Sequence, residues 1–338
     1  MKHSAEGSTG GDAMPSPEHL PPATVERVAN AVVPPMEPGR DMPHGVFRRD
    51  GTFCAASRTL ISAGRFSGVP NHPAPAETQR LEGRYLYAGV GRHHFGHFLM
   101  EGLGRLWALD HVETQVDGIL VVPMHDKDIE TVLRRRFLPF YTWLCDARPI
   151  WLIDRPVQVD DLLLPSQGFG HGHWSVGTPE FRDFVRSRVA ARITPDGPRW
   201  VYVSRTQLKS PDHRMDREDA LERTLVEKGY VVFHPEQYTI EEQLQVYMSA
   251  DRILGADGSA FHLAPFAMRP GTRLGLIQRR HRQAPFDALV AQIRAFVDVD
   301  LVTFNALRPR ETHPTPRGEP DAIRFKGLLQ DLKSAGFI

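Results

Sequence analysis

Residues 200–304 alternate short apolar runs with segments of helical periodicity, and this alternation constrains the fold more than any other feature. Each apolar run is short, and the segment after it repeats apolar residues three or four positions apart. Such an order is typical of a parallel β-sheet covered by helices on both faces. The predicted strands are Trp200–Ser204, Tyr230–Phe233, Ile253–Gly255, Leu274–Ile277 and Leu301–Phe304, and the predicted helices are Arg217–Lys228, Ile240–Ala250 and Asp287–Phe296.

The amino-terminal half carries the same α/β pattern less regularly. The predicted strands are Arg84–Ala88, Gly118–Val122, Ile150–Ile153 and Val157–Leu164, and helices are expected after Gly91, over residues 128–137 and over Pro179–Ile193. A chain of 338 residues exceeds the usual size of one domain. The Pro- and Gly-containing segment Thr194–Pro198 ends a helix, so we place the domain boundary there. The predicted domains cover residues 43–194 and 195–310.

Both ends of the chain differ from these domains. The Pro-, Gly- and Ser-rich segment 1–42 is expected to be a disordered tail. Residues 311–338 are expected to form a tail whose helix packs back onto the body. No apolar run is long enough to cross a membrane, and neither of the two cysteines has metal-ligand spacing. A cytoplasmic location is therefore expected.

The charge of the chain excludes one class of function. The formal net charge is zero, whereas a dedicated nucleic-acid binder would carry a strong basic excess. Local basic runs do occur, as in Arg279–Arg282, and we interpret them as solvated faces. No nucleic-acid partner is predicted.

The stretch Arg252–Phe266 contains a strand, a turn of small residues and a helix start. Such a turn presents backbone N–H groups at one point, which suits a phosphate or a diphosphate. The stretch lacks both the full G-x-G-x-x-G pattern and the lysine of a P-loop. The pattern therefore indicates an anion site without identifying its ligand.

A polar row lies on the helix predicted after Gly91. His97, Glu101 and Arg105 are four residues apart, so they share one face of a helix, and the apolar residues face away from it. His97 could accept a proton, with Glu101 orienting it or acting as the base itself. Two alternatives stay open at this point. Glu101 and Arg105 could form a helix ion pair, or the histidines around His93 and His97 could bind zinc with Glu101.

Three sequence blocks together resemble glycosyltransferase family 61: residues 93–109, 202–221 and 234–266. The resemblance implies two Rossmann-like domains that face a cleft, which is the GT-B arrangement. It also implies an inverting, metal-independent transfer of a hexose or pentose from a nucleotide-sugar. Three departures from the family pattern involve four positions. Asp257 stands where the family has His, Ser259 and Ala260 replace Ala-Gly, and Arg217 replaces Asn.

Site residues follow from combining the resemblance with the predicted elements. Arg205 and Arg214 are expected to clamp the donor diphosphate, because a guanidinium fork suits phosphate oxygens. The backbone of Gly258, Ser259 and Ala260 would complete that site, and Glu218 would contact the nucleotide. His97, Glu101 and Asp257 are the candidates for the catalytic base. His171 and His173 are expected at most to contact the acceptor.

The resemblance also implies the partners. The donor is expected to be UDP-linked, and the acceptor a saccharide or lipid-linked saccharide of the capsule or exopolysaccharide type. Neither a cofactor nor a metal is expected, and peripheral membrane association is left open. Two other functions compete with transfer: a zinc-dependent hydrolase that uses His93, His97 and Glu101, and a nucleotide-sugar-binding protein without catalysis.

Overall fold

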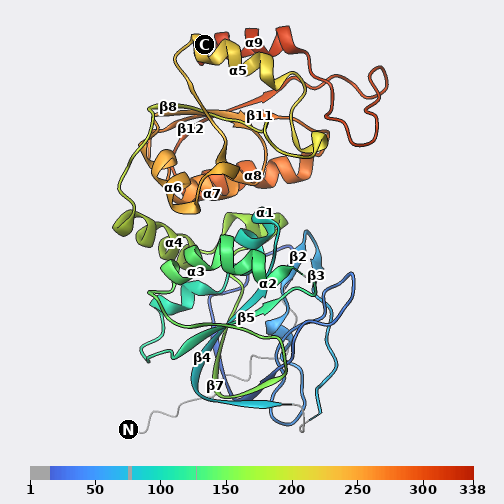
Figure 1. Ribbon diagram of the computed structural model, residues 1–338, viewed down its shortest axis with the longest axis vertical. Coiled ribbons are helices and arrows are strands. Elements are labelled where there is room, and N and C mark those ends of the chain that lie inside the picture. Colours follow the sequence, from blue (N-terminus) through green and yellow to red (C-terminus); the bar gives the residue numbers. More distant parts are fainter. Residues whose placement is uncertain (1–15, 75–77, 127) are drawn as a thin grey trace, which may run out of the picture. The chain divides into compact units, whose positions relative to one another are not determined.

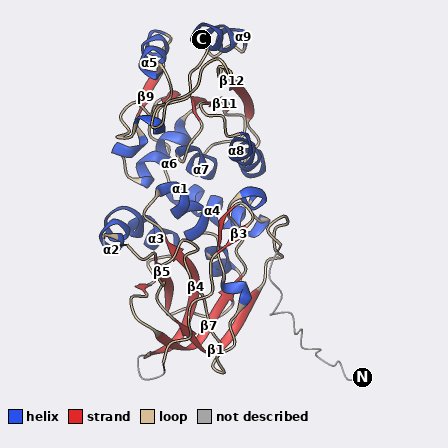
Figure 2. Cartoon of the chain, turned by 90° about the vertical axis from the view of Figure 1, so that its right-hand side faces the viewer, coloured by secondary structure: helices blue, strands red, loops and turns tan. Residues whose placement is uncertain are grey.

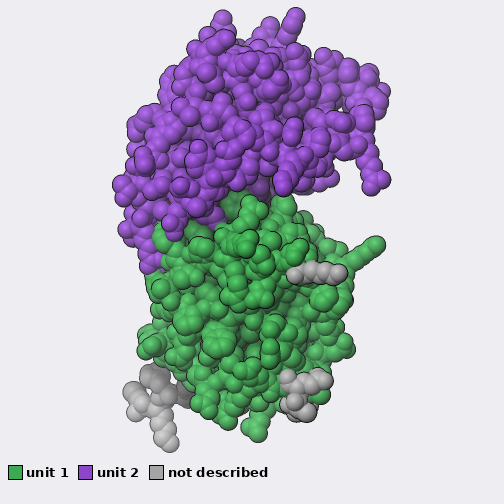
Figure 3. Space-filling model, viewed as in Figure 1, with its two compact units in different colours: residues 1–174, 178–181 green, residues 175–177, 182–338 purple. Residues whose placement is uncertain are grey.

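The computed structural model describes residues 16–74, 78–126 and 128–338 of the chain. These residues form two units (Figure 3). Unit 1 extends to Trp174 and includes Thr178–Phe181, and unit 2 consists of Ser175–Gly177 and Arg182–Ile338. The predicted boundary after residue 194 lies inside unit 2.

Unit 2 contains a five-stranded sheet with the strand order β12-β11-β10-β8-β9. Every neighbouring pair is parallel, which confirms the parallel α/β sheet predicted for this half. The strands are β8 (Trp200–Val203), β9 (Val231–Phe233), β10 (Arg252–Ala256), β11 (Arg273–Gln278) and β12 (Asp300–Asn305). Because all five run the same way, their carboxyl ends share one edge of the sheet.

Helices cover both faces of this sheet (Figure 1 and Figure 2). One face carries α5 (Glu218–Glu227) and α9 (Phe325–Ser334), and the other carries α6 (Ile240–Ser249), α7 (Ala260–Leu263) and α8 (Gln283–Phe296). The predicted capping box is present, since Thr239 accepts from the amide of Glu242 and the Glu242 carboxylate accepts in return. Helix α9 confirms the expected carboxyl-terminal helix, because its apolar residues Leu328 and Leu332 are buried against the body.

Unit 1 contains a second five-stranded sheet, ordered β1-β7-β4-β5-β6. Strand β1 is antiparallel to β7, and the other neighbours are parallel. The strands are β1 (Val25–Val33), β4 (Gln79–Gly91), β5 (Gly118–Pro123), β6 (Ile150–Leu152) and β7 (Val157–Pro165), with a small separate hairpin of β2 (Leu60–Ser62) and β3 (Arg65–Phe66). The chain as a whole is thus α/β with two largely parallel sheets.

The prediction of a disordered tail over residues 1–42 is wrong for its second half. Residues 25–33 form β1, which pairs with β7 along its whole length. Three small apolar side chains of this strand, Val28, Ala31 and Val33, are almost completely buried. Pro-rich flanks dominated the composition of the tail and concealed this valine-rich strand, whose burial stabilises it. Residues 1–15 lie outside the described part.

The helices of unit 1 are short and irregular. The segment predicted as one helix after Gly91 is instead α1 (Phe95–His97), a π-helical turn (Phe98–Gly102) and a 3₁₀ turn (Leu106–Asp110). Its expected apolar face is confirmed, since Phe98, Leu99, Leu103 and Leu106 are almost completely buried. The second helical segment consists of α2 (Ile129–Val132), a π-helical turn (Leu133–Phe137) and α3 (Leu138–Leu144).

The remaining helical segments connect these elements. Helix α4 spans Pro179–Arg192, and 3₁₀ turns lie at Ala55–Ser57, Gly172–Val176, Pro211–His213, Pro235–Gln237 and Ala264–Phe266. Within the described residues, no helix is both long and apolar enough to cross a bilayer.

Candidate active site

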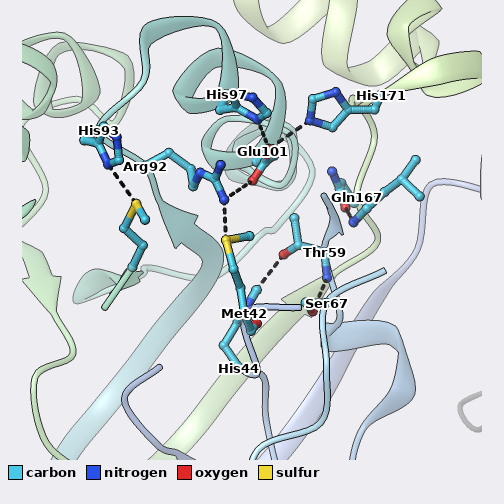
Figure 4. Close-up of polar contacts among 12 residues, drawn as sticks. Met42, His44, Thr59, Ser67, Arg92, His93, His97, Glu101, Gln167 and His171 are labelled. Atoms are coloured by element: carbon cyan, nitrogen blue, oxygen red, sulfur yellow. Dashed lines mark hydrogen bonds and ion pairs between the residues drawn. The ribbon is translucent and has the colours of Figure 1, made fainter. Parts of the chain in front are cut away.

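Glu101 is the centre of a polar cluster in unit 1 (Figure 4). Its side chain has no exposed surface, and three other side chains converge on it. Nδ1 of His97 lies 2.5 Å from Oε1, and Nε2 of His171 lies 2.8 Å from the same oxygen. Nη1 of Arg92 lies 3.5 Å from Oε2. The predicted pairing of His97 with Glu101 is therefore present.

Three separate segments deliver these groups. Arg92 directly follows β4, and His97 and Glu101 are carried by the two helical turns that come next. His171 comes from the loop after β7, seventy residues further along the chain than Glu101. Because β4 and β7 are adjacent parallel strands, the segments that follow them begin at the same edge of the sheet.

The carboxylate of Glu101 is ionised in this surrounding. Burial alone would raise the pKa of Glu101, but hydrogen bonds from His171 and His97 and the charge of Arg92 outweigh it. The net pKa lies below the ordinary value. A buried carboxylate of low pKa is a weak base, so the geometry favours Glu101 as the group that orients the two imidazoles.

The histidines keep access to solvent while Glu101 does not. The side chain of His97 is 36% exposed and that of His171 is 17% exposed. Because Nδ1 of His97 contacts an ionised oxygen, Nδ1 carries a hydrogen, and in the neutral ring Nε2 holds the lone pair. The neutral ring of His97 therefore offers an acceptor nitrogen on a partly exposed side chain, which is what a general base requires.

Arg105 does not pair with Glu101, so the predicted alternative of a helix ion pair is wrong. Its guanidinium donates to the carbonyl oxygens of Ala56 at 2.9 Å, Arg58 at 2.8 Å and Pro165. Glu101 and Arg105 do not share a helix face, although they are four residues apart, because the turns after Phe98 are π-helical and then irregular. Burial lowers the pKa of Arg105 to about 10. Arg105 thus connects the loop near residue 57 to the end of β7.

His93 lies outside the cluster, so the zinc alternative lacks one of its three expected ligands. Its Nδ1 is 2.9 Å from the sulfur of Met124 and 3.8 Å from a carboxylate oxygen of Asp126. The groups that do meet are His97, Glu101 and His171, whose potential ligand atoms all lie within 4.8 Å of one another. Two imidazoles and a carboxylate are a possible zinc set, but the Arg92 guanidinium beside the same carboxylate opposes a cation. Nothing supports the hydrolase alternative.

A buried histidine lies deeper in unit 1. His44 has no exposed surface, and its ring nitrogens contact the carbonyl oxygen of Met42 at 2.7 Å and Oγ1 of Thr59 at 2.9 Å. Burial lowers the pKa of His44 to about 4, so the ring is neutral at pH 7. Figure 4 shows His44 on the opposite side of Met42 from Arg92. His44 therefore holds the backbone of Met42, whose sulfur contacts the guanidinium of Arg92.

The second group of predicted residues meets at the carboxyl edge of the unit 2 sheet. Arg205 follows β8 by two residues, and Gly258 follows β10 by two residues, while β8 and β10 are neighbours. A Cβ atom on Gly258 would lie only 2.0 Å from Nη1 of Arg205. The guanidinium therefore lies directly over the glycine, and its Nε donates to the carbonyl of His213 at 2.5 Å.

Glu218 holds the backbone that carries Arg205. Its Oε1 accepts from the amide of Arg205 at 2.9 Å and from the hydroxyl of Tyr202 at 3.0 Å, and Oε2 accepts from the amide of Met215 at 3.2 Å. Burial raises the pKa of Glu218 despite these hydrogen bonds. Glu218 is almost completely buried, and these contacts join it to β8 and to the segment after that strand. A contact of Glu218 with the nucleotide stays a prediction.

Asp257 ties the ends of β10 and β11 together. Its Oδ1 accepts from the amide of Arg279 at 2.7 Å, and Nε of Arg279 donates to the carbonyl of Asp257 at 2.8 Å. Arg279 is only 2% exposed, so the interpretation of Arg279–Arg282 as a solvated face is wrong at this residue. Burial and then the nearby charge of Arg205 lower the pKa of Arg279 to about 9. A catalytic role for Asp257 stays a prediction.

The remaining predicted donor contacts are Arg214 and the turn of Gly258, Ser259 and Ala260. Nε of Arg214 donates to the carbonyl of Leu208 at 2.7 Å, and no hydrogen bond or ion pair within the described residues joins Arg214 to Arg205. The backbone amides of Gly258, Ser259 and Ala260 have no acceptor in the described part of the chain. The first amide of this turn to be paired is that of Phe261, which donates to Gly258.

Sequence reasoning missed the place of three residues in these sites. It did not single out Arg92, it expected His171 only as an acceptor contact, and it interpreted Arg279 as part of a solvated face. Arg92 and His171 each sit just beyond the carboxyl end of a predicted strand, which was the one usable indication. Arg279 follows β11 in the same way. The residue types gave no further indication.

Comparison with known proteins agrees with the resemblance. The glycosyltransferase 61 family model matches residues 95–275, which is more than half of the chain. The match includes His97, Glu101, His171, Arg205 and Asp257, whereas Arg92 and Arg279 lie outside it. No curated protein matches the chain. The chain belongs to glycosyltransferase family 61.

Proposed function

We propose that the chain is an inverting glycosyltransferase that needs no metal and takes its sugar from a nucleotide-sugar, UDP-linked by our expectation. The observation that carries the proposal is the buried, ionised Glu101 that holds the accessible His97. Family membership supports the general reaction. The two imidazoles and their shared carboxylate support the role of this cluster in it.

In the proposed reaction the acceptor hydroxyl oxygen attacks the anomeric carbon of the donor. The bond from that carbon to the diphosphate oxygen breaks, and the hydroxyl proton moves to Nε2 of His97. Glu101 then stabilises the resulting imidazolium through Nδ1–H, as an orienting carboxylate does in other histidine-based catalysis. His171 shares the same carboxylate oxygen, so it helps fix the position of Glu101.

Positively charged side chains beside the leaving group take the place of a metal in this proposal. Arg205 and Arg279 place two guanidinium groups near the end of β10, and burial together with the charge of Arg205 lowers the pKa of Arg279. The unpaired amides of Gly258, Ser259 and Ala260 add donors at the same turn. Together these groups would compensate the charge that develops on a departing diphosphate.

Several finer statements stay proposals. These are the GT-B arrangement, transfer of a hexose or pentose, a capsule- or exopolysaccharide-type acceptor that is soluble or lipid-linked, peripheral membrane association and a cytoplasmic location. Asp257 and Arg214 stay candidates for contacts with the donor sugar and diphosphate.

The test separates catalysis from donor binding. Thermal stabilisation by a panel of nucleotide-sugars identifies the donor, because a ligand that binds only the folded state raises the melting temperature. With that donor, we expect His97→Ala and Glu101→Ala to abolish transfer and leave donor binding nearly intact. Arg205→Ala should weaken donor binding severely.

His93→Ala is the matched control, since His93 lies outside the cluster. Full transfer activity in the His97 and Glu101 variants would refute the assignment, and stoichiometric zinc in active protein would refute metal independence.

A further inference from the structure

Unit 2 contains a pocket of about 400 Å³ that the proposed chemistry does not use. Four arginines line it: Arg280, Arg282, Arg310 and Arg317. They come from the loop after β11 and from the segment between β12 and α9. Three carboxylates also line the pocket, so the pairing of the charges decides what the pocket can bind.

Two of the three carboxylates are already engaged. Asp321 accepts from Nη2 of Arg310 at 3.0 and 3.2 Å, from the hydroxyl of Thr315 at 2.5 Å and from the amide of His281 at 2.8 Å. Asp212 accepts from the hydroxyl of Ser210 at 2.6 Å. Glu319 is the third, and it is exposed at the surface.

Three arginines of the pocket are consequently left without a carboxylate partner. No ion pair within the described residues involves Arg280, Arg282 or Arg317. Nε of Arg280 is buried and has no hydrogen-bond partner. A buried donor without an acceptor costs free energy. The pocket therefore has an excess of unpaired positive charge.

The pocket adjoins the arginine site at the end of β10. The turn Pro211–His213 lies between the two, because Asp212 lines the pocket. On the other side, the carbonyl of Asp212 accepts from Nη1 of Arg279 at 3.1 Å, and the carbonyl of His213 accepts from Nε of Arg205 at 2.5 Å. A ligand whose phosphate lies at Arg205 is thus close to the pocket.

We infer that this pocket is an anion subsite that binds a carboxylate on the donor sugar, so that the donor is the nucleotide derivative of a uronic acid. A guanidinium fork matches the two oxygens of a carboxylate. Thr315 and the acidic groups of Asp212 and Glu319 provide hydrogen-bonding partners for the hydroxyls of such a sugar. The inference rests on the proposed function, because it places the donor phosphate at Arg205. A phosphate on the sugar would use the same chemistry and must be distinguished by experiment.

The experiment compares three sugar phosphates that differ at carbon 6, so no nucleobase has to be assumed. They are glucose 1-phosphate, glucuronic acid 1-phosphate and glucose 1,6-bisphosphate, and their affinities for the full chain are measured by calorimetry. We expect the glucuronic acid compound to bind about tenfold or more tightly than glucose 1-phosphate. In the double variant Arg282→Gln, Arg317→Gln this preference should disappear, while the affinity for glucose 1-phosphate stays unchanged.

Controls separate the possible failures. Arg282 and Arg317 are exposed, so their replacement should leave the fold intact, and Arg294→Gln changes an equally exposed arginine of α8 outside the pocket. The inference is overturned if the native chain shows no preference, or if the double variant keeps it. An arginine-dependent preference for the bisphosphate alone would overturn the carboxylate assignment. By contrast, unchanged binding of all three compounds in Arg205→Ala would overturn the placement of the phosphate, and with it the proposed function.

Discussion

Gly258→Ala is the substitution that most directly tests the arginine site of unit 2. The added Cβ would lie 2.0 Å from Nη1 of Arg205, whereas ordinary contact begins at 3.4 Å. The guanidinium must therefore retreat by about 1.4 Å. The backbone of residue 258 does not have the positive φ that would strain an alanine. The methyl group consequently acts through Arg205 rather than through the backbone.

The size of the effect follows from what Arg205 loses. Retreat breaks the hydrogen bond from Nε to the carbonyl of His213, and a hydrogen bond of a charged group contributes ~1.5–3 kcal/mol. We expect the free energy of unfolding to fall by about 1–2 kcal/mol, since part of the bond can re-form with water. Affinity for UDP and for inorganic pyrophosphate should fall roughly tenfold to a hundredfold, because the guanidinium is displaced from the proposed phosphate position.

A double-mutant cycle tests the mechanism by calorimetry. If the methyl group acts through Arg205, Gly258→Ala should have almost no further effect on affinity in the Arg205→Ala background. Gly327→Ala is the matched control, because a Cβ there would have its nearest neighbour at an ordinary 3.6 Å. Equal losses of affinity from Gly258→Ala in both backgrounds would refute the reasoning.

Three further predictions concern unit 1. The folded pKa of Glu101 lies below its ordinary 4.5, so its stabilisation is present above pH 4.5 and is lost below it. Urea unfolding between pH 6 and 3 should therefore show a flatter decline of stability for Glu101→Gln, and identical slopes would contradict the ionised state. The shift of the His44 pKa from 6.5 to about 4 corresponds to about 3 kcal/mol, which is lost as the pH falls from 6.5 to 4. His44→Gln should remove this part of the pH dependence, and an unchanged profile would argue against a buried neutral ring. Arg105→Met should lower the free energy of unfolding by about 3 kcal/mol or more, because three carbonyl oxygens lose their donor. Arg134→Met, which removes only an exposed ion pair with Glu130, should change it by less than about 1 kcal/mol, and equal losses in the two variants would contradict the structural role of Arg105.

Local patterns were sufficient to predict the sheet of unit 2. They also predicted some residues of each site: His97 and Glu101 in unit 1, and Arg205 and Gly258 in unit 2. The apolar runs and helical repeats between residues 200 and 304 predicted all five strands, because each element is regular over its own length. The contact of His97 with Glu101 follows from their spacing of four residues. Arg205 and Gly258 were predictable because ligands and polar residues gather at the carboxyl ends of parallel strands.

Contacts between distant segments were not predictable from such patterns. His171 reaches Glu101 across seventy residues of sequence, and its loop has no periodicity. The burial of Arg279 depends on Asp257 and on the turn at residue 212, which a run of basic residues does not reveal. The strand Val25–Val33 was missed because its stability comes from pairing with β7, far along the chain.

The π-helical turn at Phe98–Gly102 has a consequence for how this region tolerates changes in length. A π turn usually holds one residue more than the α turn it replaces. Deleting Met100 would allow an ordinary α turn, and Glu101 would then follow His97 by three residues instead of four. The Glu101 carboxylate would therefore leave its position beside both histidines, while the residues after the turn would keep their register. We therefore expect this segment, whose five residues are all buried, to accept no change in its number of residues.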